Sequence, residues 1–204
     1  MDTAPARQKS GPMTYRDSAR PGQRVLIAGL GGSGKTTLAR ALGPVLGLPV
    51  YELDTMYYGP DLRMSPTFEE DIEHLLGSGS WLLDSQGPPV DSAAPPRVRA
   101  RLWECADTLV WLDYPRRVVL ARAIRRSLRR ILTRQRLWHG HRESPLWWLR
   151  TDHPIRKAWR LTAVRQQELT ARTTDPQWAH VTVVRLRSPR ETADWLAAVA
   201  CSAG

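Results

Sequence analysis

The sequence predicts an α/β fold in which helices cover both faces of a parallel β-sheet. Two observations support this prediction. Five short apolar runs have the length of strands and lack polar alternation, as expected of parallel strands that are buried on both faces. Segments with a helical spacing of apolar residues separate these runs, and such alternation is typical of a doubly wound sheet. A chain of 204 residues suits one domain with a sizeable core.

The expected elements follow one another in order along the chain. Strands are predicted at 25–28, 49–53, 81–84, 108–113 and 181–186. Helices are predicted at 35–46, 66–76, 94–105, 115 to about 134, and 188–199. The last helix begins with Ser188 and Pro189, and Glu191 follows at the third helical position. This spacing predicts a capping box with proline in the first turn.

The polar N-terminal segment, the length of the apolar runs and the cysteines indicate in which compartment the protein works. Residues 1–22 are polar and contain several prolines and glycines, so we expect a disordered leader before a domain at 23–200. No apolar run reaches the roughly 18 residues of a membrane span, and a signal-peptide core is lacking. Cys105 and Cys201 have no partners at metal-ligand spacing and form no disulfide scaffold. We therefore expect a cytoplasmic protein without a membrane partner.

A glycine-rich run follows the first predicted strand. Residues 29–37 read GLGGSGKTT, which matches the Walker A pattern in full and lies in the required place between a strand and a helix. The glycines let the backbone point successive N–H groups at phosphate oxygens, and the helix N-terminus adds its dipole. The run predicts a P-loop that binds ATP or GTP with Mg²⁺. The expected nucleotide contacts are Gly29, Gly31, Gly32, Ser33, Gly34, Lys35, Thr36 and Thr37.

Individual roles follow from the same pattern. Lys35 is expected to reach the β- and γ-phosphates, and Thr36 to place its hydroxyl on Mg²⁺. Asp84 ends the third strand and is the candidate for the Walker B carboxylate, which holds a water of the magnesium shell. Asp113 ends the fourth strand and is a rival, but Pro115 indicates that a helix starts there, so we favour a capping role for Asp113.

Asp54 follows the second predicted strand. Ligands of such sheets bind beyond the carboxyl ends of the strands, so its carboxylate is expected to face the site. There it could accept a proton from a substrate hydroxyl, although an ordinary turn aspartate is an equal alternative. Tyr57 and Tyr58 come next and either stack on a substrate or pack in the core.

The basic side chains are concentrated between residues 115 and 172. The whole chain has a net charge of +10, whereas this segment holds fifteen arginines and one lysine against three acidic residues, a net charge of +13. The overall charge alone would indicate a nucleic-acid binder. Because the rest of the chain is slightly acidic, however, the arginines need a local explanation.

The same segment is longer than a crossover between two strands requires. Its centre is interrupted by Gly140, Pro145 and Pro154, so we interpret residues from about 122 to 165 as a helical, arginine-rich lid insertion. Lids of this kind close on substrate, and we expect residues 137–154 to gain protection from hydrogen exchange when nucleotide binds. His139 and His141 lack a third zinc ligand at a suitable spacing.

The first helix of the insertion carries a line of arginines. Leu120, Ile124, Leu128 and Ile131 have helical spacing and are expected to pack inward. Arginine stabilises the negative charge that develops in phosphoryl transfer, so the line above the P-loop supplies catalytic candidates. The two candidates are Arg122 and Arg126, and the other arginines are expected to form a solvated basic face.

These segments together resemble the adenylate-kinase-like P-loop NTPases that are labelled DNA topology modulation proteins. The resemblance covers about residues 24–199 and rests on the Walker run, on Leu53-Asp54, on the WLD run at 111–113 and on the RLRSPRE run at 185–191. It implies a five-stranded parallel sheet in the order 2-3-1-4-5 with a mobile lid, ATP on the P-loop and an acceptor near Asp54.

The resemblance also implies that Arg187 and Pro189 lie beside the nucleotide base. One departure concerns the acceptor. The third strand of these proteins usually ends in aspartate-glycine-asparagine, whereas this chain has Asp84-Ser85-Gln86. The aspartate is kept, but its neighbours on the acceptor side differ.

The sequence therefore predicts a kinase that transfers the γ-phosphoryl group of Mg-ATP to a small acceptor: a nucleotide, a nucleoside or a hydroxylated metabolite. Two alternatives stay open, a kinase of nucleic-acid 5′-hydroxyls and a non-catalytic, ATP-dependent regulator of DNA or of a partner protein. Salt distinguishes them, because binding to nucleic acid through many arginines weakens steeply with ionic strength.

Overall fold

The computed structural model describes residues 21–59, 63–88, 93–133 and 154–202. Within these ranges the chain forms a five-stranded parallel sheet in the order β2-β3-β1-β4-β5, which confirms the predicted fold class and strand order. The strands are β1 (Arg24–Gly29), β2 (Val50–Tyr51), β3 (Trp81–Leu83), β4 (Thr108–Leu112) and β5 (Thr182–Leu186).

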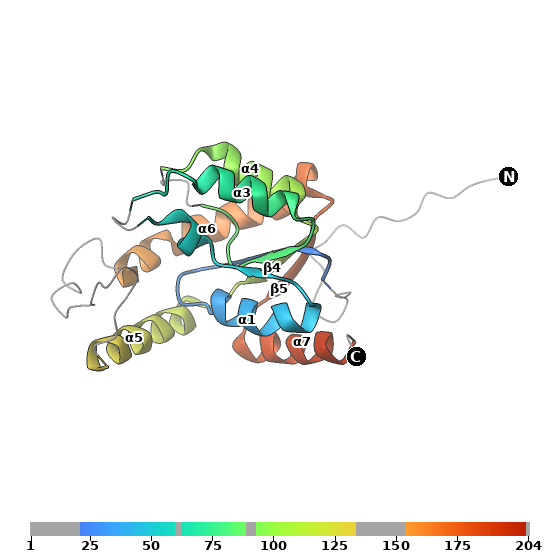
Figure 1. Cartoon of the computed structure of the whole chain (residues 1–204). Helices are drawn as coiled ribbons and strands as arrows, with labels where there is room; N and C mark the ends of the chain where they lie inside the picture. Colours follow the sequence, from blue (N-terminus) through green and yellow to red (C-terminus); the bar gives the residue numbers. More distant parts are fainter. Residues whose placement is uncertain (1–20, 60–62, 89–92, 134–153, 203–204) are drawn as a thin grey trace.

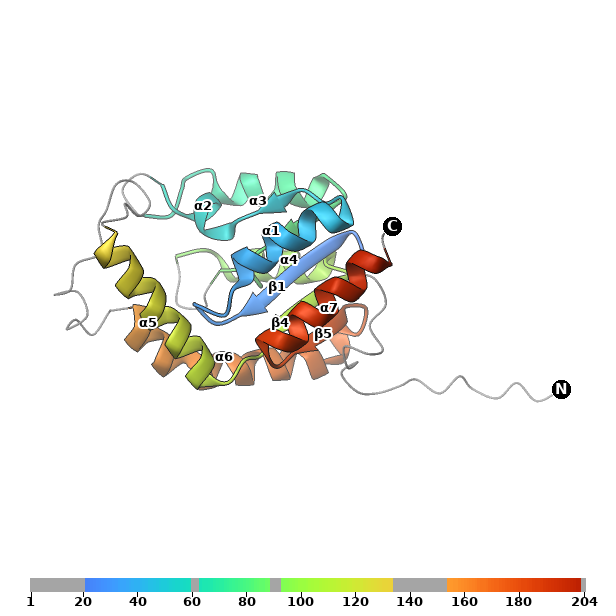
Figure 2. The same ribbon diagram turned by 90° about the horizontal axis from the view of Figure 1, so that it is seen from below.

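Helices cover both faces of this sheet (Figure 1). On one face lie α1 (Lys35–Leu46) and α7 (Pro189–Cys201), which Figure 2 shows in front of the strands. On the other face lie α3 (Phe68–Gly77), α4 (Pro96–Cys105) and α6 (Pro154–Thr174). The remaining helices are α2 (Leu53–Tyr57), α5 (Arg116–Leu132) and the 3₁₀ turn η4 (Pro176–Trp178).

The apolar core consists of two layers, one on each face of the sheet. Along β1, Leu26 and Ala28 belong to the layer under α3 and α4, whereas Val25 and Ile27 belong to the layer under α1 and α7. Successive side chains of a strand point to opposite faces, and here both faces are covered. This explains why the strand sequences lack polar alternation.

The second predicted strand differs most from the structure. β2 ends at Tyr51, and the chain then turns into the short helix α2, which the sequence analysis missed. Five residues are too few for a helical period to stand out from a strand-like apolar run. As a result Asp54 lies in the first turn of α2 and not at the end of a strand.

The inward face of α5 also differs from the prediction. Leu128 was expected to pack inward, but 47% of it is exposed, whereas Val119 and Ala123 are buried. The reason is the P-loop: a Cβ on Gly32 would lie 3.3 Å from the carbonyl oxygen of Val119 and 3.4 Å from Cβ of Ala123. α5 thus rests on the glycine backbone, and only small or backbone atoms fit in this contact.

Part of the predicted insertion lies outside the described residues. Residues 134–153 of the insertion, which include His139 and His141, are not among the described residues. The same is true of most of the predicted leader. The described parts of the insertion are the C-terminal half of α5 and the start of α6. Among the helices that the structure describes, none combines the length and the apolar character needed to cross a bilayer.

Gly43 shows how closely α1 packs on the sheet, and its replacement is a test of the fold. A Cβ on Gly43 would lie 2.3 Å from Cγ2 of Val50 and 3.1 Å from the carbonyl oxygen of Leu48. Because the β-branched Val50 cannot easily turn away, Gly43→Ala should lower the free energy of unfolding by about 1–3 kcal/mol, measured by urea denaturation. Gly77→Ala is the control, since nothing lies within 4 Å of its Cβ position. Equal stability of both variants would contradict this packing.

Candidate active site

The register of the sheet brings several predicted site residues to one edge. Gly29 pairs with Leu112 and Leu112 with Leu186, so the loops after β1, β4 and β5 begin at the same level. On the other side of β1, Leu83 pairs with Tyr51, so Asp84 and Glu52 follow β3 and β2 side by side. In a parallel sheet this edge, at the carboxyl ends of the strands, is where ligands bind.

The P-loop connects β1 to α1 at this edge. Gly32 and Gly34 have φ angles of 94° and 101°, in the left-handed region that favours glycine. Gly34 precedes the first residue of α1, and no side chain caps this helix. The first N–H groups of α1 therefore point at the loop without a side-chain acceptor, which is the arrangement that binds phosphate at helix N-termini.

Two details of the loop fit a bound polyphosphate. The Ser33 hydroxyl is buried and has no hydrogen-bond partner among the described residues. Such a group costs free energy until a partner satisfies it, and a phosphate oxygen would do so. A Cβ on Gly31 would meet nothing within 4 Å, so the loop is open at that point. The residues present therefore fit the ATP that the motif implies.

Asp84 connects the P-loop helix to α2. Its Oδ2 accepts a hydrogen bond from the Thr36 hydroxyl at 2.6 Å, and its Oδ1 accepts one from the Leu53 N–H at 3.1 Å. A carboxylate and a hydroxyl in contact supply the hard oxygen ligands that Mg²⁺ takes beside phosphate oxygens and water. The predicted metal pair, Thr36 and Asp84, thus lies together and fits the ion.

Lys35 lies among charges of both signs. Burial lowers the pKa of its ammonium group, and the carboxylates of Asp84 and Asp54 oppose this shift. The positive charges of Arg165 and Arg126 lower the pKa of Lys35 further. Lys35 therefore lies within electrostatic range of the two predicted carboxylates and of two arginines.

Asp54 lies on α2, across from the P-loop helix. Partial loss of solvation by burial raises the pKa of its carboxyl group. The positive charge of Lys35 lowers this pKa, and the negative charge of Asp84 raises it. Since Asp54 as a whole is exposed, solvent moderates this shift. The neighbouring Tyr57 is buried, and its hydroxyl accepts a hydrogen bond from the Ala93 N–H at 3.1 Å, which makes it a core residue.

The predicted arginines reach the site from α5. Arg122 Nη1 donates a hydrogen bond to the carbonyl oxygen of Ser33 at 2.9 Å, and its guanidinium lies 5.3 Å from the centre of the Tyr114 ring. Arg126 acts electrostatically on Lys35. The sequence analysis missed Arg165 on α6, whose charge acts on both Lys35 and Asp54. Nothing in the sequence separates Arg165 from the other arginines of the insertion.

Asp113 has neither of the roles considered for it. Its carboxylate accepts hydrogen bonds from Arg185 Nε at 2.9 Å, Arg185 Nη2 at 2.6 Å and Gln166 Nε2 at 2.8 Å. The Arg185 guanidinium also lies 4.3 Å from the centre of the Trp111 ring. Asp113 therefore ties β4 to β5 and α6 and is satisfied by these partners.

The residues implied to flank the nucleotide base follow β5 at the same edge of the sheet. Pro189 is the first residue of α7, and the exposed Arg187 precedes its cap. The Ser188 hydroxyl accepts from the Glu191 N–H at 3.1 Å, which confirms the helix cap. The Glu191 carboxylate, however, accepts from the Arg187 N–H and not from that of Ser188. Contact of Arg187 and Pro189 with a base stays a prediction.

Comparison with known proteins bears on the fold. No protein-family model and no curated protein sequence matches this chain. A shikimate kinase from Acinetobacter baumannii in complex with shikimate aligns with a TM-score of 0.52 at 16% identity, over 88% of this chain and 92% of that one. A gluconokinase from Sinorhizobium meliloti 1021 aligns with a TM-score of 0.43 at 20% identity, over 91% and 97%. The first likeness shows that the chain has the fold of P-loop kinases.

The nucleotide cradle can be tested at Lys35. Lys35→Ala removes the cation on which both carboxylates act and should abolish the rise in melting temperature that Mg-ATP gives the wild-type protein, because ligand-induced stabilisation scales with affinity. A thermal-shift titration measures this. Arg40→Ala is the matched control: it lies on the same helix, but its partner is Glu52 on the protein surface. If the wild type shows no shift, or Lys35→Ala shifts equally, the cradle does not bind nucleotide.

Proposed function

We propose that the chain is a kinase that transfers the γ-phosphoryl group of Mg-ATP to a hydroxyl group of a small acceptor. The observation that carries this proposal is the convergence of Lys35, Asp84 and Asp54 at one edge of the sheet: Asp84 accepts hydrogen bonds from the residue after Lys35 and from the residue before Asp54. A module that only binds nucleotide needs Lys35 and Asp84. It has no use for a second carboxylate, Asp54, on the opposite side of the crevice.

The P-loop side binds and orients the phosphates. The N–H groups at the start of α1 and the Ser33 hydroxyl bind phosphate oxygens, and Lys35 pairs with the β- and γ-phosphates. Mg²⁺ held by Thr36 and Asp84 would neutralise charge on the phosphates. Because phosphoryl transfer requires mainly positioning and charge neutralisation, Arg122, Arg126 and Arg165 contribute positive charge around the transferred group.

The acceptor side depends on Asp54. A carboxylate at this place orients the acceptor hydroxyl and takes its proton. Surroundings that raise the pKa of Asp54 make it a better base, since a conjugate acid of higher pKa holds the proton more firmly. Support for a small acceptor comes from the shared fold, because the A. baumannii protein is a kinase that binds shikimate.

The narrower resemblance to DNA topology modulation proteins and a cytoplasmic location are part of the same proposal. An acceptor panel should contain nucleosides, nucleoside monophosphates, hydroxylated carboxylates, sugars and an oligonucleotide with a 5′-hydroxyl end. Turnover of one of the small acceptors that is insensitive to salt supports the proposal. Turnover of the oligonucleotide alone, falling steeply with ionic strength, would replace it with a nucleic-acid kinase.

Asp54→Asn separates a kinase from a binding module. The change keeps the shape and removes the charge, so it should leave the affinity for Mg-ATP unchanged and lower the rate of phosphoryl transfer about 10²- to 10⁴-fold. Glu104→Gln is the control, since the exposed Glu104 carboxylate pairs with Arg101 on α4, away from the P-loop edge of the sheet. Loss of ATP binding in Asp54→Asn would place Asp54 in the magnesium shell, and no effect on either quantity would make it an ordinary surface aspartate.

The pH dependence of the rate gives a second test. A base works only when it is deprotonated, so the rate should fall as the pH falls through the pKa of Asp54. Because that pKa is raised, the acidic limb should lie above the value of about 3.9 for an ordinary aspartate. A pH–rate profile of kcat/KM checks this, and the residual activity of Asp54→Asn should lack the limb. An identical acidic limb in this variant would assign the titration to another group.

A further inference from the structure

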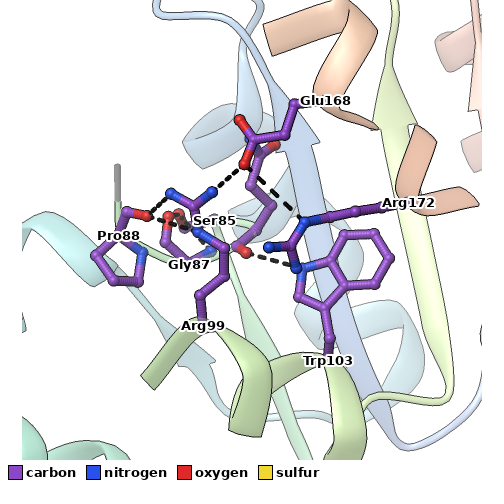
Figure 3. Close-up of polar contacts among 8 residues, drawn as sticks. Ser85, Gly87, Pro88, Arg99, Trp103, Glu168 and Arg172 are labelled. Atoms are coloured by element: carbon purple, nitrogen blue, oxygen red, sulfur yellow. Dashed lines mark hydrogen bonds and ion pairs between the residues drawn. The ribbon is translucent and has the colours of Figure 1, made fainter. Parts of the chain in front are cut away.

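A partly buried ion pair joins α4 to α6 beside the candidate site (Figure 3). Only 8% of the Arg99 side chain is exposed, and its Nη1 donates a hydrogen bond to the Glu168 carboxylate of α6. Its Nε donates to the carbonyl oxygen of Pro88 at 2.9 Å, and its Nη2 donates to the same oxygen. Burial lowers the pKa of Arg99, and the charge of Glu168 opposes this, so the guanidinium stays charged.

The same part of α4 holds the loop 85–88, which starts directly after Asp84. One turn beyond Arg99, Trp103 Nε1 donates a hydrogen bond to the carbonyl oxygen of Gln86 at 3.1 Å. Gly87 has a φ angle of 109°, and a Cβ on it would lie 3.0 Å from Cγ of Arg99. The loop is therefore packed against α4 at its backbone, with two carbonyl groups satisfied by side chains of that helix.

On the other side, the pair holds one turn of α6. Glu168 also pairs with Arg172 at 4.0 Å, and the Arg172 guanidinium lies 5.4 Å from the centre of a Trp103 ring, as Figure 3 shows. Glu168 is three residues from Arg165, so the two side chains leave neighbouring positions of the same helix. Arg165 lines a small cavity together with Gly29 and Leu30 at the start of the P-loop and with Gln86 of the loop 85–88.

We propose that Arg99 and Glu168 are positioning residues, which fix α6 against the loop 85–88 so that Arg165 faces the transferred phosphoryl group. An ion pair with one buried partner gains little net stability, because desolvation of Arg99 offsets much of the attraction to Glu168, and an apolar pair would join the helices as well. The pair instead fixes an orientation. Three donors of the Arg99 guanidinium hold the loop 85–88 and α6 in one relative geometry. The kinetic part of this proposal rests on the proposed kinase function.

The test uses two conservative variants in the full-length chain. Arg99→Lys keeps the charge but cannot bridge Pro88 and Glu168 with a planar fork, and Glu168→Gln keeps the shape but not the charge. Each should lower kcat about tenfold to a hundredfold while KM for Mg-ATP stays within twofold, because a displaced group costs rate in the transition state. The double variant should be no slower than the slower single one, because both changes break the same contact.

Arg97→Lys is the matched control. Arg97 lies on α4 as well and pairs with Glu69, but 72% of its side chain is exposed, so its replacement should leave kcat unchanged. Rates are expressed per folded molecule from the melting curve of each variant. A kcat equal to that of the wild type in both variants, a rise in KM for Mg-ATP instead of a fall in kcat, or additive losses in the double variant would overturn the proposal.

Hydrogen exchange separates this proposal from the function on which it rests. If the wild type transfers no phosphoryl group to any acceptor or to water, the kinase proposal fails. Amide hydrogen exchange then tests separately whether Arg99 and Glu168 position α6. In the presence of Mg-ATP, Glu168→Gln should then speed amide exchange in 163–172 and 85–88 and leave α1 unchanged. Unchanged exchange in both segments would overturn the positioning role.

Discussion

The arrangement of the site depends on the carboxylate of Asp84. Only 8% of Asp84 is exposed. Its carboxylate accepts hydrogen bonds from the Thr36 hydroxyl of the P-loop helix and from the Leu53 N–H at the start of α2. A buried carboxylate is costly unless it is paired, and here its partners belong to the start of α1 and the start of α2. The spacing between the start of α1 and the start of α2 is thus set by one residue at the end of β3.

Much of this was predictable because it depends on local sequence. The Walker pattern, the buried strands and the Ser188 cap are decided by neighbouring residues, and the structure contains the loop, the cap and, apart from the shorter β2, the strands where the sequence predicted them. Apart from α2, which is too short for a helical period, what failed depends on contacts between distant segments. The inward face of α5 is decided by the backbone of Gly32, and Arg165, Arg99 and Glu168 gain their positions only when α4 and α6 pack together.

The arginines of the segment 115–172 do not form one uniform basic surface, because several of them make specific contacts of different kinds. Arg122 binds a P-loop carbonyl group, Arg165 acts on the two charged groups of the crevice, and Arg172 lies against a tryptophan ring of α4. Each contact has a different geometry and a different energetic origin. A net charge calculated from composition therefore describes this protein poorly, and the nearly complete use of arginine over lysine suits contacts that need a planar, multidentate donor.

Because α5 contacts the P-loop through its first two turns, a small movement of the P-loop would become a larger movement at the far end of the helix. Its first two turns rest on Gly32 and on the carbonyl group of Ser33, while its 17 residues extend for roughly 25 Å at 1.5 Å of rise per residue. A tilt of about 5° at the P-loop end would move the far end by roughly 2 Å over that length. An adjustment of the P-loop too small to disturb its own hydrogen bonds would thus be amplified mechanically into a displacement larger than a bond length at the opposite end of the helix.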